Sequence, residues 1–190
     1  MKRVTKALSI FICLMMVVGV LVPMAGVASA SPIRSVGSST ALLDLLAGTG
    51  SFAGSPLADG DTINITSTFS HATPITLTDM RTPGITISIN ANVTFTLEAS
   101  SAESMLELDN SILNVTGSGT LVIRNTAPAA TPPAKMIAVA MDQESELNNN
   151  GATVNISAAD SSIDVMGTTA KISNISQIGP GAITASDGVG

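Results

Sequence analysis

The sequence has a single cysteine and very few aromatic residues. Cys13 is the only cysteine, Trp and Tyr are absent, and there are four phenylalanines. One cysteine cannot form a disulfide within the chain, so a disulfide framework is excluded. Recognition of sugars and nucleobases commonly uses aromatic faces. The composition therefore argues against a carbohydrate site based on stacking, and it leaves Ile, Val, Leu, Met and Ala to form the core.

Basic residues are also scarce. The whole chain has 8 Lys and Arg against 14 Asp and Glu. Without Lys2, Arg3 and Lys6, which lie in the first six residues, the formal net charge becomes −9. A surface of this sign repels nucleic acids and anionic membranes, so we expect neither as a partner.

The usual catalytic motifs are missing. No Gly-x-Ser-x-Gly sequence occurs, and His71 is the only histidine. We expect His71 to lie solvated in a turn before Pro74, and Arg81 to form a local ion pair with Asp79. The sequence therefore offers no catalytic residue and favours a protein that is not an enzyme.

The N-terminal segment has the three-part layout of a secretory signal peptide. A basic start is followed by an uncharged apolar run over residues 7–22 and by the small residues Ala28-Ser29-Ala30. The alternative is a membrane anchor, but the run is shorter than the roughly twenty residues that a spanning helix needs. We expect residues 1–30 to be removed, leaving one secreted or cell-surface domain with no membrane contact.

The rest of the chain repeats short segments of alternating aliphatic and polar residues, as in Ile85-Thr86-Ile87-Ser88-Ile89. This alternation predicts β-strands, separated by short turns rich in Gly, Asn, Asp, Ser and Pro. The predicted strands are 62–66, 74–78, 84–89, 93–97, 105–108, 112–115, 120–123, 136–141, 152–156, 162–165, 170–175 and 181–184.

Three observations favour a right-handed parallel β-helix, which is a solenoid, over the alternative of a β-sandwich. Hairpin dipeptides are scarce, with Asn150-Gly151 the one clear internal candidate. Similar triplets recur about twenty residues apart: Ile85–Ile87 with Leu106–Leu108, and Val93–Phe95 with Leu113–Val115. Aliphatic residues of similar size also suit columns that stack from turn to turn.

A short helix is predicted before the first of these strands. Residues 38–40 supply hydroxyl groups for an N-cap, Ala41–Ala47 is rich in leucine, and Gly48 provides a stop. Because so short a helix is unstable alone, we expect it to pack on an apolar surface at the end of the coil. Residues 31–38 before it are expected to be a mobile start.

The helix, the loop after it and the segment Asp59-Gly60-Asp61-Thr62-Ile63-Asn64-Ile65 resemble the beginning of parallel β-helix proteins of the pectin-lyase-like class. The resemblance covers residues 39–125 and implies an N-terminal helix that closes the open end of the coil. It also implies that an enzyme of this class would carry its carboxylates, with Ca²⁺ or a basic residue, on the outside of one parallel sheet.

The chain departs from this pattern after Asn125. Residues 31–125 are expected to form the cap and the first turns, 126–134 a loop of Pro and Ala, and 135–190 further turns. The last residues stop in the middle of the repeating pattern, so we expect the chain to be the front part of a longer coil.

Two kinds of site have candidate residues. Asp142, Glu144 and Glu146 would share one face of an extended strand and could bind Ca²⁺ through their oxygen atoms; solvated surface charges are the alternative. Ca²⁺ is thus the only cofactor with candidate ligands. Five Asn-x-Ser/Thr sequences are candidate glycosylation sites: Asn64, Asn92, Asn114, Asn155 and Asn174.

These features together predict an exported, secreted or cell-surface β-helical protein with a structural, adhesin-like or binding role. Its expected partner is a cell-wall or extracellular polysaccharide, or a host or partner surface. The alternative is the N-terminal part of a polysaccharide lyase or glycoside hydrolase with its active site beyond Gly190. A third interpretation is an anchored component of a surface layer or cell wall.

Overall fold

The computed structural model describes residues 32–100, 104–128, 136–142, 144–166, 169–175, 177–178 and 182–185. All of them belong to one compact unit, residues 31–190. The expected signal peptide lies outside the described residues.

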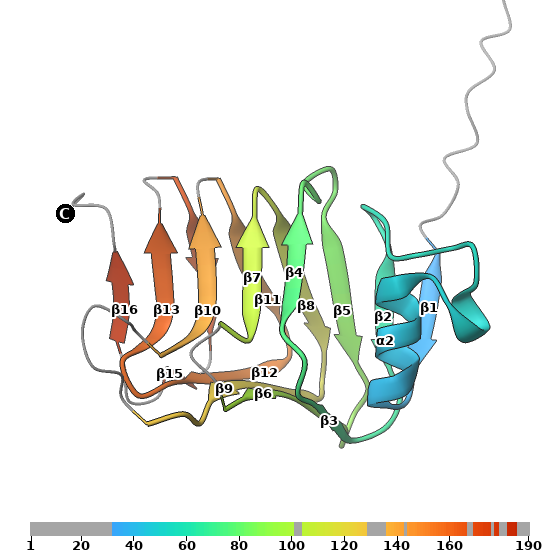
Figure 1. Cartoon of the computed structure of the whole chain (residues 1–190), viewed down its shortest axis with the longest axis horizontal. Coiled ribbons are helices and arrows are strands. Elements are labelled where there is room, and N and C mark those ends of the chain that lie inside the picture. Colours follow the sequence, from blue (N-terminus) through green and yellow to red (C-terminus); the bar gives the residue numbers. More distant parts are fainter. Residues whose placement is uncertain are drawn as a thin grey trace, which may run out of the picture. The chain divides into compact units, whose positions relative to one another are not determined.

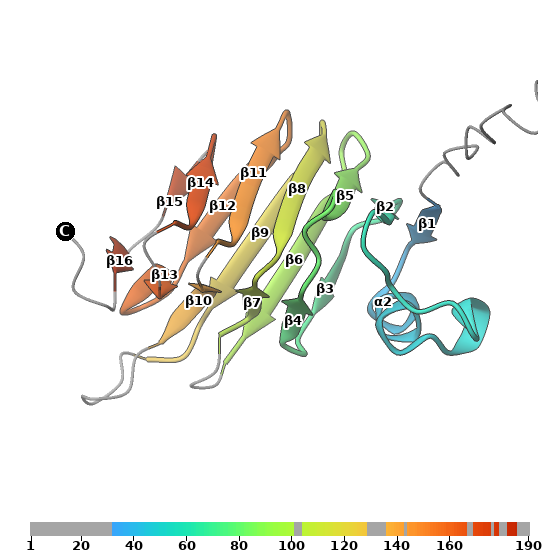
Figure 2. The ribbon, with the colours of Figure 1, turned by 90° about the horizontal axis from the view of Figure 1, so that it is seen from above.

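This unit is a β-solenoid of about five turns built from three parallel sheets (Figures 1 and 2). We call them sheets A, B and C. Sheet A contains β1 (Ile33–Val36), β2 (Thr62–Ile65), β5 (Ile85–Ile89), β8 (Ile112–Gly117), β11 (Glu146–Asn150) and β14 (Lys171–Ser173). Sheet B contains β3 (Phe69–His71), β6 (Thr94–Ala99), β9 (Thr120–Asn125), β12 (Thr153–Ser157) and β15 (Gln177–Ile178). Sheet C contains β4 (Ile75–Thr78), β7 (Leu106–Asp109), β10 (Ile137–Asp142), β13 (Ser161–Met166) and β16 (Ala182–Ala185).

Alternation of aliphatic and polar residues produces this architecture. In sheet A, Ile63 pairs in register with Ile87, which pairs with Val115 of the next turn. All three side chains are buried, and the polar residues between them face outward. Each strand pairs in parallel with the equivalent strand of the next turn, so the predicted parallel β-helix is confirmed and the β-sandwich alternative is wrong.

The predicted twenty-residue repeat is wrong. Thr62 pairs with Thr86, and Ile85 pairs with Leu113, so a turn takes 24 to 28 residues here. Leu106 pairs with Ile75 in sheet C instead of with a strand of sheet A. The matching triplets belong to different sheets and look alike because every strand has the same inward aliphatic pattern.

The predicted capping helix is confirmed as α2 (Ser39–Ala47). The Ser38 hydroxyl accepts the Ala41 N–H at the N-terminus, and Gly48 ends the helix in the left-handed conformation, at φ 63°. Leu42 and Leu45 are buried, and Leu46 packs against the same core. A short 3₁₀ helix (Gly50–Phe52) follows.

The expected mobile start is wrong where it is described, because Ile33–Val36 forms β1 at the edge of sheet A. Arg34 lies 3.4 Å from the carboxylate of Asp61, which is 2% exposed. Strands β3, β11 and β15 were also not predicted. They lie where short polar segments interrupt the aliphatic pattern.

The corners after sheet C repeat in successive turns. Asp79, Asn110 and Glu144 all have positive φ, between 48° and 64°, which turns the chain toward sheet A. Behind them, the buried Ser111 hydroxyl accepts the Met80 N–H (3.1 Å), and the Ser145 hydroxyl accepts the N–H of Ser111 (3.2 Å). Each serine thus satisfies a backbone donor of the preceding turn.

Most of the expected Pro/Ala loop, from residue 129 onward, lies outside the described residues. Its two ends are tied together, since the Asn125 amide donates to the Ile137 carbonyl at 3.1 Å. Strand β10 then pairs with β7 of the preceding turn. The coil therefore continues with β10 on the far side of this segment.

Candidate functional surfaces

His71 is buried, so its predicted place in a solvated turn is wrong. It ends β3, is 1% exposed, and its Nδ1 lies 2.9 Å from the Ser39 hydroxyl of α2. Its Nε2 has no hydrogen-bond partner among the described residues. Burial lowers the pKa of His71 from its usual 6.5, although a hydrogen bond with the Thr73 backbone opposes this shift. The hydrogen bond between Ser39 and His71 links the cap to sheet B.

Among the described residues, no third group of a catalytic triad accompanies this serine–histidine pair. A histidine that takes a proton from serine needs an acceptor on its other nitrogen to stabilise the imidazolium. In the part of the chain that the structure describes, that nitrogen is buried and has no partner.

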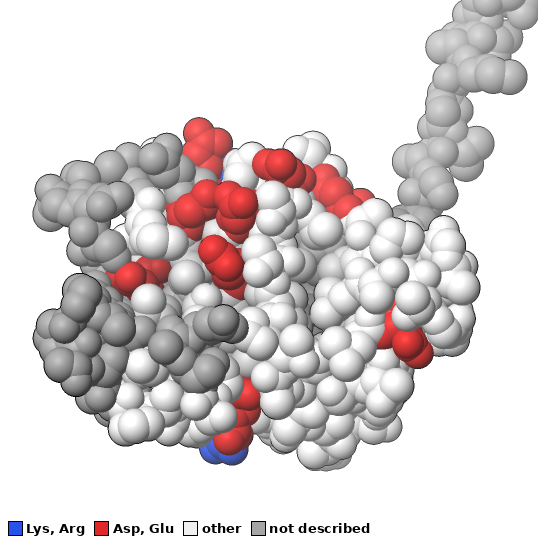
Figure 3. All heavy atoms as spheres, in the orientation of Figure 1, with Lys and Arg blue, Asp and Glu red and all other residues white. Residues whose placement is uncertain are grey.

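Carboxylates form a row along the end of sheet C. Figure 3 shows Asp and Glu side chains gathered there. Asp109 lies opposite Thr78, and Asp142 follows one turn later. A hydrogen bond to the Asp142 side chain raises the pKa of Asp109, and desolvation and the charges of Asp142, Asp79 and Glu107 add to this. Burial alone would raise the pKa of Asp142, but the Asn110 N–H (2.7 Å) and the Ser145 hydroxyl (2.8 Å) donate to it and lower its pKa.

Arg81 is the cation beside this row. Its expected partner Asp79 instead accepts from the Asn110 amide at 2.8 Å. The guanidinium of Arg81 lies 3.4 Å from the Glu144 carboxylate and also donates to the Glu144 carbonyl. The predicted local pair is therefore replaced by contacts with later turns of the coil.

The three Ca²⁺ candidates do not lie along one extended strand. Asp142 ends β10, Glu144 is in the corner at φ 64°, and Glu146 begins β11. Glu146 is bound to Lys171 at 2.9 Å, and this contact lowers its pKa. In the described part of the chain, no group of three or more His, Cys, Asp or Glu side chains is arranged to hold a metal ion.

The five candidate glycosylation sites differ in exposure. Asn64, Asn114 and Asn155 lie within strands and are partly buried. Asn92 and Asn174 are exposed in turns, but the Asn174 amide donates to the Asn149 carbonyl at 3.2 Å. Asn92 is consequently the asparagine best placed to accept a glycan.

The outward face of sheet A carries two columns of uncharged polar side chains, which we call the polar ladder. It was not predicted as a site, although the alternating Thr, Ser and Asn residues are its signal. Three neighbours in one column are joined: Asn148 donates to Asn114 at 3.4 Å and accepts from Ser173 at 2.9 Å. The columns are Thr62–Thr86–Asn114–Asn148–Ser173 and Asn64–Ser88–Thr116–Asn150.

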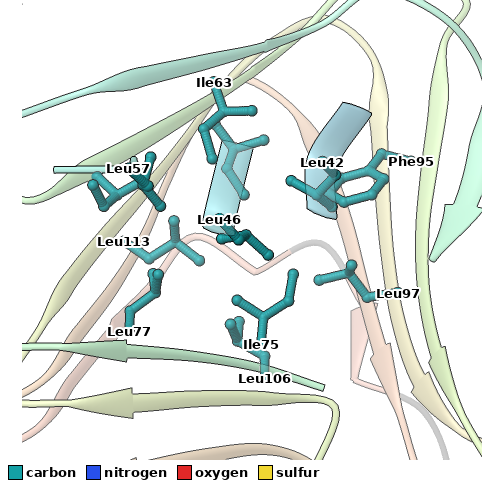
Figure 4. A pocket seen from close by; sticks show the side chains of 12 residues that line it. Leu42, Leu46, Leu57, Ile63, Ile75, Leu77, Phe95, Leu97, Leu106 and Leu113 are labelled. Carbon is teal, nitrogen blue, oxygen red and sulfur yellow. The ribbon is translucent and has the colours of Figure 1, made fainter. Parts of the chain in front are cut away.

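An apolar groove lies between α2 and β4, with a volume of about 250 Å³. It is lined by Leu46, Leu57, Met80 and residues 74–77. A small apolar cavity of about 20 Å³ also lies inside the coil (Figure 4). Its lining shares Leu46, Leu57, Ile75 and Leu77 with the groove. The cap thus meets the first turns with incomplete packing.

No family model matches this chain, and no curated protein or solved structure matches it either. No helix in the described ranges is long and apolar enough to cross a lipid bilayer.

Proposed function

We propose that this protein is exported and acts outside the cell as a non-catalytic binding protein, with the polar ladder of sheet A holding an extracellular polysaccharide. The regular array of uncharged polar side chains is the observation that carries this proposal. Parallel strands repeat at about 4.8 Å, so the ladder presents donors and acceptors at one regular spacing. A ligand that repeats along its length can meet such an array at many points.

The chemistry of the ladder suits hydroxyl-rich ligands. An asparagine amide donates and accepts, and a Ser or Thr hydroxyl does both. No charged residue interrupts the two columns, and Glu146 at their border is neutralised by Lys171. Single contacts of this kind are weak, at about 0.5–1.5 kcal/mol each. Binding therefore depends on many rungs acting together.

Binding is tested by retention of the purified protein on insoluble polysaccharides such as cellulose, chitin and peptidoglycan. We expect Ser88→Lys, in the middle of the ladder, to lower retention at least tenfold. The matched control is Thr96→Lys, which places the same side chain on the outward face of β6 in sheet B. Equal retention of both variants and the unmodified protein would contradict the proposal.

Export is supported by the layout of residues 1–30 and is tested separately. Mass spectrometry of the protein recovered outside its host cell should give Ser31 as the first residue. An intact N-terminus in a cytoplasmic fraction would contradict export without affecting the binding result.

The acidic row of sheet C favours a second candidate function, that of a polysaccharide lyase. The resemblance implies carboxylates and a basic residue on the outside of one parallel sheet, and Asp109 and Asp142 lie with Arg81 at the outer end of sheet C. Incubation with uronate polymers and Ca²⁺ tests it. A rise in ultraviolet absorbance from unsaturated products would favour the lyase over the non-catalytic protein.

A further inference from the structure

The first turn of the coil lacks a strand in sheet C. Sheet A begins with β1 and β2, but sheet C begins only with β4. Helix α2 lies instead across this end of the coil, where it contacts β1 and β3 (Figures 1 and 2). A helix uses its backbone groups within itself, so it cannot complete the ladder of hydrogen bonds along β4.

One edge of β4 is therefore free. The N–H groups of Ile75 and Asp79 donate to Met105 and Asp109 of the next turn, both at 3.0 Å. Because backbone groups alternate in direction along a strand, those of Thr76 and Thr78 point the other way, toward α2. No other described strand pairs with this edge. Free edges of this kind are templates for an added strand.

The apolar groove accompanies the free edge. Leu46 and Leu57 form one wall, and Ile75 and Leu77 lie on the other, while Thr76 remains exposed. Figure 3 shows the surface hollowed between the cap and sheet C. An extended segment bound here could bury every second side chain against apolar residues.

The outward side of the same edge is acidic. The Thr76 hydroxyl donates to the Glu107 carboxylate at 3.3 Å, and Thr78 lies opposite Asp109. A strand added beside β4 would place its outward side chains next to these residues. Long cationic side chains can reach carboxylates on the next strand but one, and opposite charges across a sheet are favourable.

We propose that the groove binds an extended peptide segment in which apolar and basic residues alternate, and that this segment adds to sheet C along β4. Backbone hydrogen bonds to Thr76 and Thr78 provide the pairing, the groove receives the apolar side chains, and Glu107 selects for basic ones. A second copy of the chain that paired through its own β4 would suit this edge less well, because β4 contains no basic residue.

The test measures fluorescence anisotropy of a labelled eight-residue peptide of alternating Val and Lys with the whole protein. Controls are a peptide with the same residues in two blocks and one alternating Val and Glu. We expect only the Val–Lys peptide to bind. Thr76→Pro removes the N–H that faces the groove and leaves the bonds to β7 in place, so it should weaken binding at least tenfold. Thr76→Ala is its matched control and should bind within about threefold of the unmodified protein.

Glu107→Lys tests the charge selection even if Thr76→Pro does not fold. This residue is partly exposed, and we expect its replacement to favour the Val–Glu peptide over the Val–Lys peptide. Equal binding of the alternating and block peptides, or unchanged selectivity in Glu107→Lys, would overturn the proposal. Sedimentation showing a dimer that Thr76→Pro separates would assign the edge to a second copy and overturn it as well.

Discussion

The packing of α2 on the coil leads to a quantitative prediction for Leu42. Its side chain is 2% exposed and lines the internal cavity. Leu42→Ala removes three buried carbon atoms, worth about 2.4 kcal/mol at about 0.8 kcal/mol each. The substitution also enlarges a cavity that is already present and that the neighbouring side chains cannot fill. This larger cavity further lowers the free energy of unfolding. Losses measured for such substitutions reach about 5 kcal/mol, so we expect 3–5 kcal/mol.

The matched control is Leu43→Ala in the same helix, where the side chain is 42% exposed. It should change the free energy of unfolding by less than about 0.5 kcal/mol. Urea unfolding followed by circular dichroism measures both values, and hydrogen exchange locates the loss. Turns of a solenoid contact only their neighbours, so exchange should increase more in β2 than in β13. Equal losses for Leu42→Ala and Leu43→Ala would refute the assignment of α2 as a packed cap.

Three further predictions concern other parts of the coil. Since the pKa of His71 is lowered on folding, the unfolded state binds the proton more tightly, and stability should fall as pH drops below 6.5; urea midpoints of His71→Asn should depend less on pH there. Gly117 has φ 94°, and a methyl group added there would meet the Ile89 carbonyl. Gly117→Ala should therefore lower the thermal midpoint much more than Gly54→Ala, whose new methyl group meets open space. Similar midpoints for the two variants would contradict the corner geometry. Asp109→Asn should raise the thermal midpoint at pH 7 but not at pH 3, because the hydrogen bond with Asp142, the desolvation and the neighbouring charges that raise the pKa of Asp109 all disfavour only its ionised form.

The sequence predicts the elements that depend on local patterns. The alternation over Ile85–Ile89 identifies a strand, whichever strand it pairs with. Hydroxyl residues and a glycine mark the two ends of α2. The register could not be predicted in the same way. Inward columns of all three sheets use the same few aliphatic residues, so spacing alone does not reveal which strand lies above which.

The elements that sequence reasoning missed depend on distant partners. Strand β1 has only four residues, two of them polar, and it is held by β2 and by the contact of Arg34 with Asp61. In the sequence, His71 is a polar residue close to a proline. Ser39, its partner, comes beside it only when the coil folds. The polar ladder is a property of the register, so it becomes visible only once the turns are stacked.

The repeated corners after sheet C have an evolutionary consequence. Asp79, Asn110 and Glu144 turn the chain in the same way, and each buried serine serves the turn before it. A duplication or deletion that begins at one corner and ends at the next would therefore keep the same kind of serine contact on either side. We therefore expect such a coil to vary in length by complete turns, and we expect differences of a few residues to be confined to loops.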